Sequence, residues 1–259
     1  MNIIVCLKRV PDTTARIEIE KDGLDIKTDL PWILNPYDEF AVEEAIRIKE
    51  RFGGKVTLVT AGAGGGEEIL RKGVAMGADS AVYVKDPLLN GLEGIGAARV
   101  LSALIREVLF DLVLCGKRGT DADSGVVGPA IATLLNIPLV TAVKKLDIFP
   151  EERRAEALRE TEEGAEAVEC PMPAVFTAEK GLNEPRYPSL TGIMKAKKAE
   201  IKYIDLNSLG VGPDLFKDTL KREGLSYPQV KRKGVILNGD IAEQVKEAVK
   251  FLKTEVKVI

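Results

Sequence analysis

The residues of this chain best suited to binding a charged ligand come directly after an apolar run near its middle. Segment 116–129 (GKRGTDADSGVVGP) follows the run Asp111–Cys115 and leads into a helical pattern. We expect this helix to begin near Ser124, with Asp123 or Ser124 as its cap. Because a helix N-terminus exposes N–H groups and carries partial positive charge, it favours an anion such as a phosphate. The spacing therefore indicates nucleotide binding, with a purely structural loop as the alternative.

Side chains within segment 116–129 add chemistry to that helix N-terminus. Lys117 and Arg118 can contribute positive charge, while Thr120 and Asp121 can bond to hydroxyl groups. Glycines at the start of the helix leave its first N–H groups open to a ligand. Acidic side chains close to a phosphate would repel it unless they turn toward backbone donors.

A second candidate is the segment Asn35-Pro36-Tyr37-Asp38. Asn35 suits an N-cap, Pro36 suits the first helical position, and Asp38 lies at the third, as in a capping box. That explanation is purely structural. The functional interpretation adds that a helix N-terminus with an amide and the Tyr37 ring beside it can hold a nucleotide.

Two further loops follow apolar runs. The first run ends in Cys6-Leu7-Lys8-Arg9, a basic loop closed by Pro11. Segment 61–67 (AGAGGGE) is rich in glycine, but the sixth position of the dinucleotide fingerprint, counted from Gly62, is Glu67. The chain contains no GxxxxGK[ST] motif, so a P-loop is absent. A flexible turn is the simpler interpretation of segment 61–67.

A candidate docking segment lies further along, at 183–198 (NEPRYPSLTGIMKAKK). Two prolines restrain the approach to Leu190, and a short basic helix follows. One interpretation is a solvated helix preceded by a loop. The other is a protruding hydrophobic anchor beside the cations Lys195, Lys197 and Lys198, suited to an acidic partner.

Composition excludes several classes of function. The chain has 259 residues and no histidine, which removes Ser-His-Asp hydrolysis, Cys-His proteolysis and zinc sites built on imidazole. Cys6, Cys115 and Cys170 are far apart, so we expect no metal centre, and unpaired thiols suit a reducing cytoplasm. A net charge of −3 argues against nucleic-acid binding. We also expect no membrane insertion and no signal peptide.

The order of elements predicts an α/β fold, with a mostly parallel sheet covered by helices on both faces. Short apolar runs rich in Val, Ile and Leu are typical of parallel strands buried on both sides. These runs are Asn2–Leu7, Lys55–Ala61, Ser80–Val84, Asp111–Cys115, Ile137–Val143 and Met172–Ala178. The helical patterns between them include Asp38–Arg51, Glu67–Met76 and Ile95–Leu109. Their alternation implies right-handed crossovers.

The chain divides into two parts on this evidence. Residues 1–182 form the α/β nucleotide-binding domain, from which the charged segment 144–170 emerges as a hairpin or excursion. Residues 183–259 hold the docking segment and an irregular C-terminal arm with a last short helix over Ile241–Leu252. Such an arm either packs on a partner or is a plain extension.

Several blocks resemble one family, the beta (small) subunits of the electron-transfer flavoproteins. They are VCLKRVPD at 5–12, NPYDEFAVEE at 35–44, AMGAD at 75–79, the segment 116–129 and GLNEPRYPSLTGIMKAKK at 181–198. The blocks match in order and spacing from the first strand to the tail. The last of them is close to the family signature.

The resemblance implies a heterodimer with an alpha subunit that holds the redox-active FAD. The beta chain would be a Rossmann-like adenine-nucleotide-binding domain with a structural AMP, and its C-terminal arm would wrap over the alpha subunit. The positions that match the family's nucleotide site are Cys6, Asn35, Pro36, Tyr37, Asp38, Ala61, Gly116, Lys117, Arg118, Gly119, Thr120, Asp121, Ala122, Asp123, Ser124, Gly125, Val126 and Val127. Thr13 and Tyr37 match positions near the flavin.

The same resemblance implies a place in electron transport. Leu190 matches the recognition-loop leucine that anchors in acyl-CoA dehydrogenases, and Lys195, Lys197 and Lys198 match a methylatable segment. Electrons would enter the alpha-subunit FAD from an acyl-CoA dehydrogenase and leave to a membrane quinone-linked oxidoreductase. The beta chain would perform no bond chemistry itself.

Two alternatives remain open at this point. AMP-binding members carry Asn-Gln-Thr-Gly where this chain has Gly125–Gly128, whereas Val127–Pro129 resembles electron-bifurcating members with a second FAD in place of AMP and NADH as donor. Asp121–Ser124, however, departs from the Asp-Gly-Asp-Thr of those members, and AMP is the preferred ligand. The other alternative is a free-standing adenine-nucleotide-binding protein, which is disfavoured because Cys6–Arg9 lacks a Ser-Gly-Gly loop.

Overall fold

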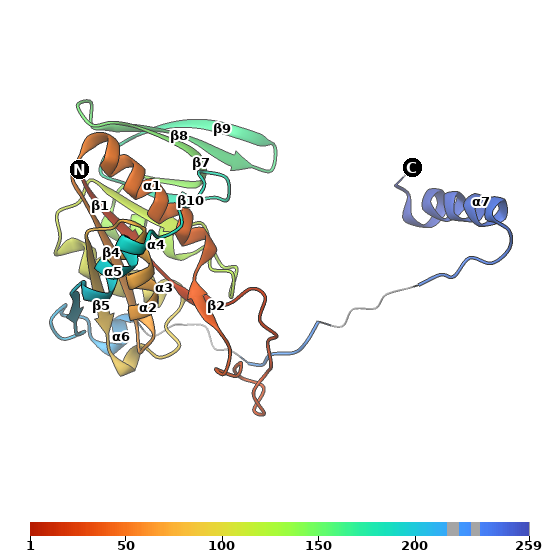
Figure 1. Cartoon of the computed structure of the whole chain (residues 1–259), viewed down its shortest axis with the longest axis horizontal. Helices are drawn as coiled ribbons and strands as arrows, with labels where there is room; N and C mark the ends of the chain where they lie inside the picture. The colour runs from red at the N-terminus through yellow and green to blue at the C-terminus, as the bar shows by residue number, and fades with distance from the viewer. Residues whose placement is uncertain (217–222, 229–233, 259) are drawn as a thin grey trace.

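The computed structural model describes residues 1–216, 223–228 and 234–258, and its central element is a nine-stranded sheet (Figure 1). The strand order is β11-β5-β4-β1-β6-β10-β7-β8-β9. All pairings are parallel except β7–β8 and β8–β9. The strands are β1 Asn2–Cys6, β4 Lys55–Gly62, β5 Ser80–Lys85, β6 Leu112–Gly116, β7 Leu139–Phe149, β8 Arg154–Thr161, β9 Gly164–Pro171, β10 Ala174–Ala178 and β11 Ile201–Ile204. A separate ribbon pairs β2 Arg9–Pro11 with β3 Trp32–Leu34.

Helices cover both faces of this sheet, as the sequence predicts. The helices of the described residues are α1 Pro36–Phe52, α2 Gly66–Met76, α3 Gly94–Arg106, α4 Val127–Leu135, α5 Leu190–Lys198, α6 Pro213–Phe216 and α7 Ile241–Phe251, with short turns η1 Pro87–Leu89 and η2 Leu252–Val256. Ile3 and Val5 of β1 pack with residues of α1 and α2, whereas Ile4 and Cys6 pack with those of α3 and α4. Successive side chains of a strand point to opposite faces. This alternation explains why the strands are apolar without a break.

The charged segment 144–170 is a hairpin that widens the sheet. β7 continues past the predicted run to Phe149, and β8 and β9 add to it in antiparallel register. Ala155 and Ala157 of β8 face the core, while Glu156 between them is exposed. The prediction of a hairpin is therefore confirmed, and the charges lie on its solvent-exposed side.

The helix after β6 begins three residues later than the sequence predicts. α4 spans Val127–Leu135, although we expected a start near Ser124. Asp123 and Gly125 have φ values of +54° and +60°, and this left-handed backbone cannot belong to a right-handed helix. The expected caps are also wrong, because the N-cap residue is Val126 and no side chain caps it.

Part of the chain beyond residue 182 joins the same sheet. β11 pairs with β5, and α5 packs on α2, where a Cβ on Gly192 would lie 2.3 Å from the Ala75 carbonyl oxygen. α7, in contrast, has no buried residue and stands apart from the sheet (Figure 1). Within the described ranges, no helix is long and apolar enough to cross a membrane.

Candidate functional site

The site begins where β1 and β6 lie side by side and the chain leaves them toward opposite edges of the sheet. From β1 the chain passes through α1 to β4, and from β6 it passes through α4 to β7. In open parallel sheets, ligands bind in the crevice beyond the carboxyl ends of two such strands. The candidate segments that follow β1 and β6 meet here.

Asp38 joins three chain segments at this crevice. Its Oδ2 accepts a hydrogen bond from the Lys8 backbone N–H at 2.7 Å. Its Oδ1 accepts one from the Gly116 N–H at 3.0 Å and one from Asn35 Nδ2 at 2.9 Å. Asp38 is only 4% exposed. A buried carboxylate in the first turn of α1 therefore holds the ends of β1 and β6 together.

Asn35 is the N-cap residue of α1 and Pro36 is its first helical residue, as we expected. No side-chain cap bond forms, and the predicted capping box is wrong. Instead, Asn35 Nδ2 donates both to Asp38 and to the Arg118 carbonyl oxygen at 3.0 Å, while its Oδ1 accepts from the Thr120 N–H at 3.3 Å. The buried amide therefore connects α1 to the segment after β6, because that segment supplies partners that a local cap would not.

Two opposing effects act on the pKa of Asp38, and burial is the larger of them. Burial raises the pKa of Asp38 to about 7, while the hydrogen bonds from Lys8, Asn35 and Gly116 act in the opposite direction. All three partners are donors, so each favours the ionised carboxylate. This group therefore changes charge near neutral pH at the base of the crevice.

The two cations expected to face a phosphate are paired with protein groups. Lys117 Nζ lies 2.5 Å from Glu179 Oε2. Arg118 donates to the Tyr37 hydroxyl at 3.1 and 3.2 Å, and its Nε lies 3.0 Å from Asp123 Oδ1. Asp123 thus turns toward Arg118, and Arg118 fixes the position of the Tyr37 ring.

Asp121 lies next to another cation of the crevice. Its Oδ2 is 2.7 Å from Lys8 Nζ, an ion pair between the segment after β6 and the segment after β1. Both side chains are partly exposed. The two loops that flank the crevice are therefore joined at its rim by this pair and at its base by Asp38.

The N-terminus of α4 offers backbone donors to an anion. The N-cap residue is Val126, and no side chain accepts a hydrogen bond from the first turn of α4. The first N–H groups of a helix have no intrahelical acceptor, and here these include the N–H groups of Val127 and Gly128. A Cβ on Gly128 would lie 2.5 Å from Thr177 Cγ2, so the first turn packs directly on β10. This donor set fits the phosphate of a nucleotide.

Three further residues that we predicted for the site are Cys6, Ala61 and Thr13. Cys6 is buried at the end of β1, and its hydrogen bond with Cys115, together with burial, raises the pKa of the Cys115 thiol. Ala61 lies near the end of β4, the strand beside β1. Thr13 is exposed between β2 and β3, outside the hydrogen bonds described above.

Sequence reasoning missed Lys8, Thr60 and Glu179 as parts of the site. Thr60 Oγ1 donates to the Leu7 carbonyl oxygen at 2.8 Å and fixes the end of β1. Glu179 follows β10 directly and binds Lys117. The signal for Glu179 was present, since a charged residue directly after a buried parallel strand lies at the ligand-binding edge.

The docking segment presents apolar side chains to solvent. Leu190 is 84% exposed and Tyr187 is 97% exposed. Lys195, Lys197 and Lys198 are exposed on the last turn of α5. Across the part of the chain that the structure describes, no group of three or more metal-ligating side chains occurs.

Comparison with known proteins gives one consistent result. A model of the electron transfer flavoprotein domain matches residues 24–209. The chain is 41% identical over 260 residues to the electron transfer flavoprotein subunit beta of Bacillus subtilis, covering 100% of both chains. It is 40% identical over 259 residues to that of Thermoanaerobacterium thermosaccharolyticum, covering 98% of each. It is also 39% identical over 216 residues to the caffeyl-CoA reductase-Etf complex subunit CarD of Acetobacterium woodii, covering 83% of this chain and 82% of that one. The chain therefore belongs to the electron transfer flavoprotein family, among its beta subunits.

Proposed function

We propose that this chain and an alpha subunit form a heterodimer that carries electrons from acyl-CoA dehydrogenases to a membrane quinone-linked oxidoreductase. FAD, held mainly by the alpha subunit, supplies the redox chemistry when bound. The observation that carries the proposal is Leu190, an apolar side chain 84% exposed beside three lysines. An exposed leucine at a structured position suits insertion into a partner's pocket, and the lysines suit an acidic rim.

The beta chain's own contribution is to hold a nucleotide and to complete the flavin environment. AMP would lie in the crevice between β1 and β6, with its phosphate at the N-terminus of α4 and its base near Asn35. Tyr37, held by Arg118, and Thr13 are the residues we place near the flavin. The cation Arg118 also lies over the Tyr37 ring, 5.4 Å from its centroid, which favours one ring orientation.

The C-terminal arm is proposed to pack on the alpha subunit. α7 has a capping box at Asp240 and Glu243, so it is a well-formed helix. Its exposed apolar residues include Ile241, Val245 and Val249, which share one face at helical spacing. A helix with an uncovered apolar face gains most from covering that face with a partner.

The docking proposal is tested with Leu190→Ala in the purified heterodimer. We expect the rate of reduction by an acyl-CoA dehydrogenase to fall while the FAD content stays at the wild-type value. Lys180→Ala, which removes an exposed charge upstream of the loop, serves as the control. An unchanged rate with Leu190→Ala would contradict the docking role.

An electron-bifurcating subunit with a second FAD is the alternative. The residues Val127-Gly128-Pro129 at the start of α4 favour it. Denaturing the heterodimer and measuring the released nucleotides by mass spectrometry separates the two functions. One FAD and one AMP per heterodimer support the shuttle, whereas two FAD and no AMP, with reduction by NADH, support bifurcation.

The proposed location is the cytoplasm, with the quinone-linked oxidoreductase at the membrane surface. Three buried cysteines, all unpaired, are compatible with a reducing compartment. Fractionation of cells with an antibody to this chain tests the location. Recovery with the membrane-integral fraction, or outside the cell, would contradict it.

A further inference from the structure

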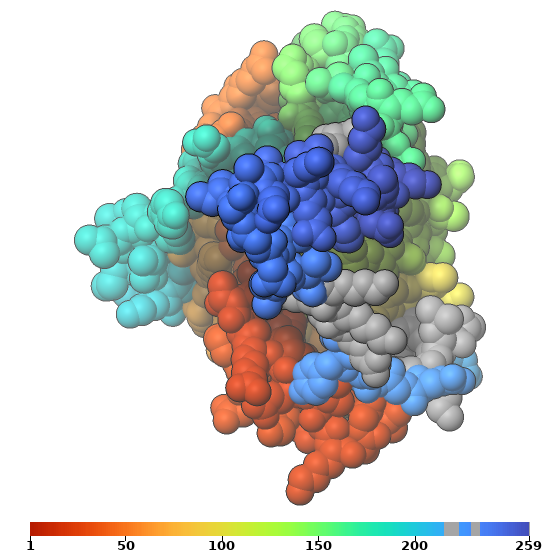
Figure 2. All heavy atoms as spheres, turned by 90° about the vertical axis from the view of Figure 1, so that its right-hand side faces the viewer, coloured from red at the N-terminus to blue at the C-terminus, as the bar shows by residue number. Residues whose placement is uncertain are grey.

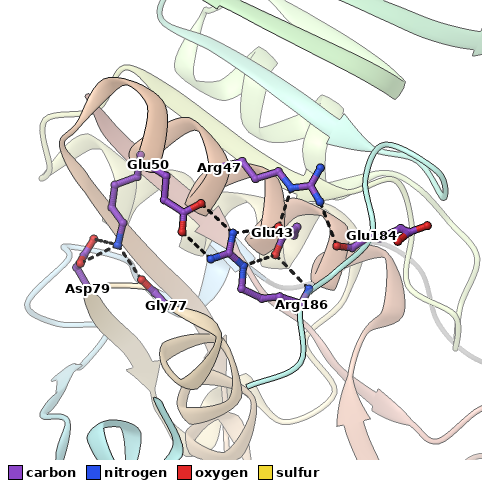
Figure 3. A network of polar contacts seen from close by, with 8 residues as sticks. Glu43, Arg47, Glu50, Gly77, Asp79, Glu184 and Arg186 are labelled. Carbon is purple, nitrogen blue, oxygen red and sulfur yellow. Dashed lines mark hydrogen bonds and ion pairs between the residues drawn. The ribbon is translucent and has the colours of Figure 1, made fainter. Parts of the chain in front are cut away.

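The chain leading to Leu190 is fastened to α1 at Asn183, whose Nδ2 donates to the Phe40 carbonyl oxygen and to Glu44 Oε2, and most extensively at Arg186 (Figure 3). Arg186 Nε lies 2.8 Å from Glu43 Oε2, and its Nη2 lies 3.1 Å from Glu43 Oε1. Its Nη1 and Nη2 lie 2.6 and 3.0 Å from the two carboxylate oxygens of Glu50. The Arg186 backbone N–H also donates to Glu43 Oε2 at 3.1 Å. A single guanidinium therefore binds two carboxylates that lie two turns apart on α1.

The carboxylate of Glu43 is buried, so water cannot readily take the place of Arg186 as its hydrogen-bond partner. The Glu43 side chain is 2% exposed. Burial acts to raise the pKa of Glu43, but hydrogen bonds from Arg186 and Arg47 outweigh it and hold the pKa below its usual value. Arg47 also donates to the Glu184 carbonyl oxygen at 3.3 Å. Removing the Arg186 side chain would leave a buried carboxylate without the strongest of its partners.

The other end of the docking segment is fastened to α2. Arg71 donates to the carbonyl oxygens of Ala196, Lys197 and Ala199 at the end of α5. At the start of α5, Gly192 allows close contact with the backbone of α2. The segment is therefore held at both ends against helices of the main fold.

The large side chains between these two attachments contribute little to the packing of the fold. Tyr187 and Leu190 are almost fully exposed, and Pro188 between them restricts the backbone. Figure 2 shows the segment that includes α5 (cyan) as a projection from one side of the molecule. Because the loop is attached at both ends, its two large exposed side chains are already ordered. The entropy cost of ordering the loop is therefore not added to the free energy of binding a partner.

We propose that Arg186 is the positioning residue of this docking surface. By binding Glu43 and Glu50, it holds the loop so that Tyr187 and Leu190 face the acyl-CoA dehydrogenase together. Arg186 binds α1 and acts through Tyr187 and Leu190. The partner's identity rests on the proposed function, whereas the attachment of the loop does not.

The test compares heterodimers carrying Arg186→Ala, Arg186→Lys or the control Lys180→Ala. We expect Arg186→Ala to speed hydrogen exchange of residues 183–192 by about tenfold or more, because the Arg186 amide and its neighbours lose their anchor. The apparent KM of an acyl-CoA dehydrogenase for the heterodimer should rise by about tenfold while kcat stays within about twofold. Arg186→Lys should restore part of the exchange protection and part of the KM, since lysine keeps the positive charge but lacks the planar guanidinium that binds two carboxylates.

A double-variant cycle separates positioning from a general structural role. If Arg186 acts through Tyr187 and Leu190, adding Arg186→Ala to the variant Tyr187→Ala/Leu190→Ala should raise KM no further. Additive effects would overturn the proposal, as would unchanged exchange in Arg186→Ala or faster exchange with an unchanged KM. If the wild-type heterodimer is reduced by none of the acyl-CoA dehydrogenases of its own genome, the proposed function fails, while the exchange data still decide whether Arg186 holds the loop.

Discussion

Replacing Asp38 by Asn removes the one carboxylate whose charge changes near neutral pH at the base of the crevice. The pKa of Asp38 is about 7 in the folded chain, against a reference value of 3.8. Between these values the folded state binds one proton more than the unfolded state, so stability falls as pH rises. The full shift corresponds to on the order of 4 kcal/mol, and the slope to about 1.4 kcal/mol per pH unit.

The assay is urea unfolding of the heterodimer followed by circular dichroism at several values between pH 4.5 and 8. We expect the free energy of unfolding of the wild type, relative to Asp38→Asn, to decrease by about 1.4 kcal/mol per pH unit up to about pH 6.5 and to level off above pH 8. The amide adds a constant offset, because its NH₂ group faces donors, but it does not change the slope.

Asp111→Asn serves as the matched control. Asp111 accepts one backbone hydrogen bond, from Asn2 N–H at 2.8 Å, and lies at the opposite end of β6. Parallel pH profiles for the wild type and Asp38→Asn would refute the reasoning. They would mean that the three donor bonds offset the cost of burying the carboxylate.

Three further predictions concern close packing and the docking segment. Gly192→Ala should lower stability by about 1–3 kcal/mol, because its Cβ would meet a backbone oxygen of α2 at 2.3 Å, and thermal unfolding of the heterodimer measures this loss. Gly128→Ala, whose Cβ would lie 2.5 Å from Thr177 Cγ2, should shift the start of α4 and reduce the nucleotide recovered per heterodimer, with an unchanged yield as the contrary result. Because the pKa of Glu43 is lowered in the fold, its stabilising contribution is present above pH 4.5 and is lost as pH falls through the lower folded value. Protection against hydrogen exchange near Arg186, measured relative to the intrinsic exchange rate at each pH, should therefore fall in acid, and Glu43→Gln should show low protection already at pH 7.

Local patterns in the sequence predicted most strands of the main sheet and the helices between them. Each predicted apolar run overlaps a strand of the sheet, and the helical patterns at 38–51 and 67–76 lie within α1 and α2. These assignments rest on the periodicity of apolar residues, which local backbone geometry determines. The start of α4 was missed because left-handed backbone at Asp123 is a property of the folded loop and leaves no periodic signal.

The site shows where local reasoning ends. The sequence identified Asn35, Asp38 and segment 116–127 as candidates, but it left open whether the first two serve only to cap a helix. In the fold they bond to Lys8, Gly116 and Thr120, which lie 30 to 85 residues away. Side-chain chemistry alone could name these residues, but only the strand order could bring their partners within hydrogen-bond distance.

By itself, the sequence determined the α/β class and the exposed leucine of the docking segment, because each follows from residue type and short-range spacing. Tertiary structure alone decided that Asp38 joins β1 to β6, that Lys117 and Arg118 are paired, and that Arg186 binds α1. The physical reason is that hydrogen bonds and ion pairs act over about 3 Å. Arg186 and Glu43 are separated by 143 residues along the chain, and only the packing of the docking segment on α1 makes them neighbours.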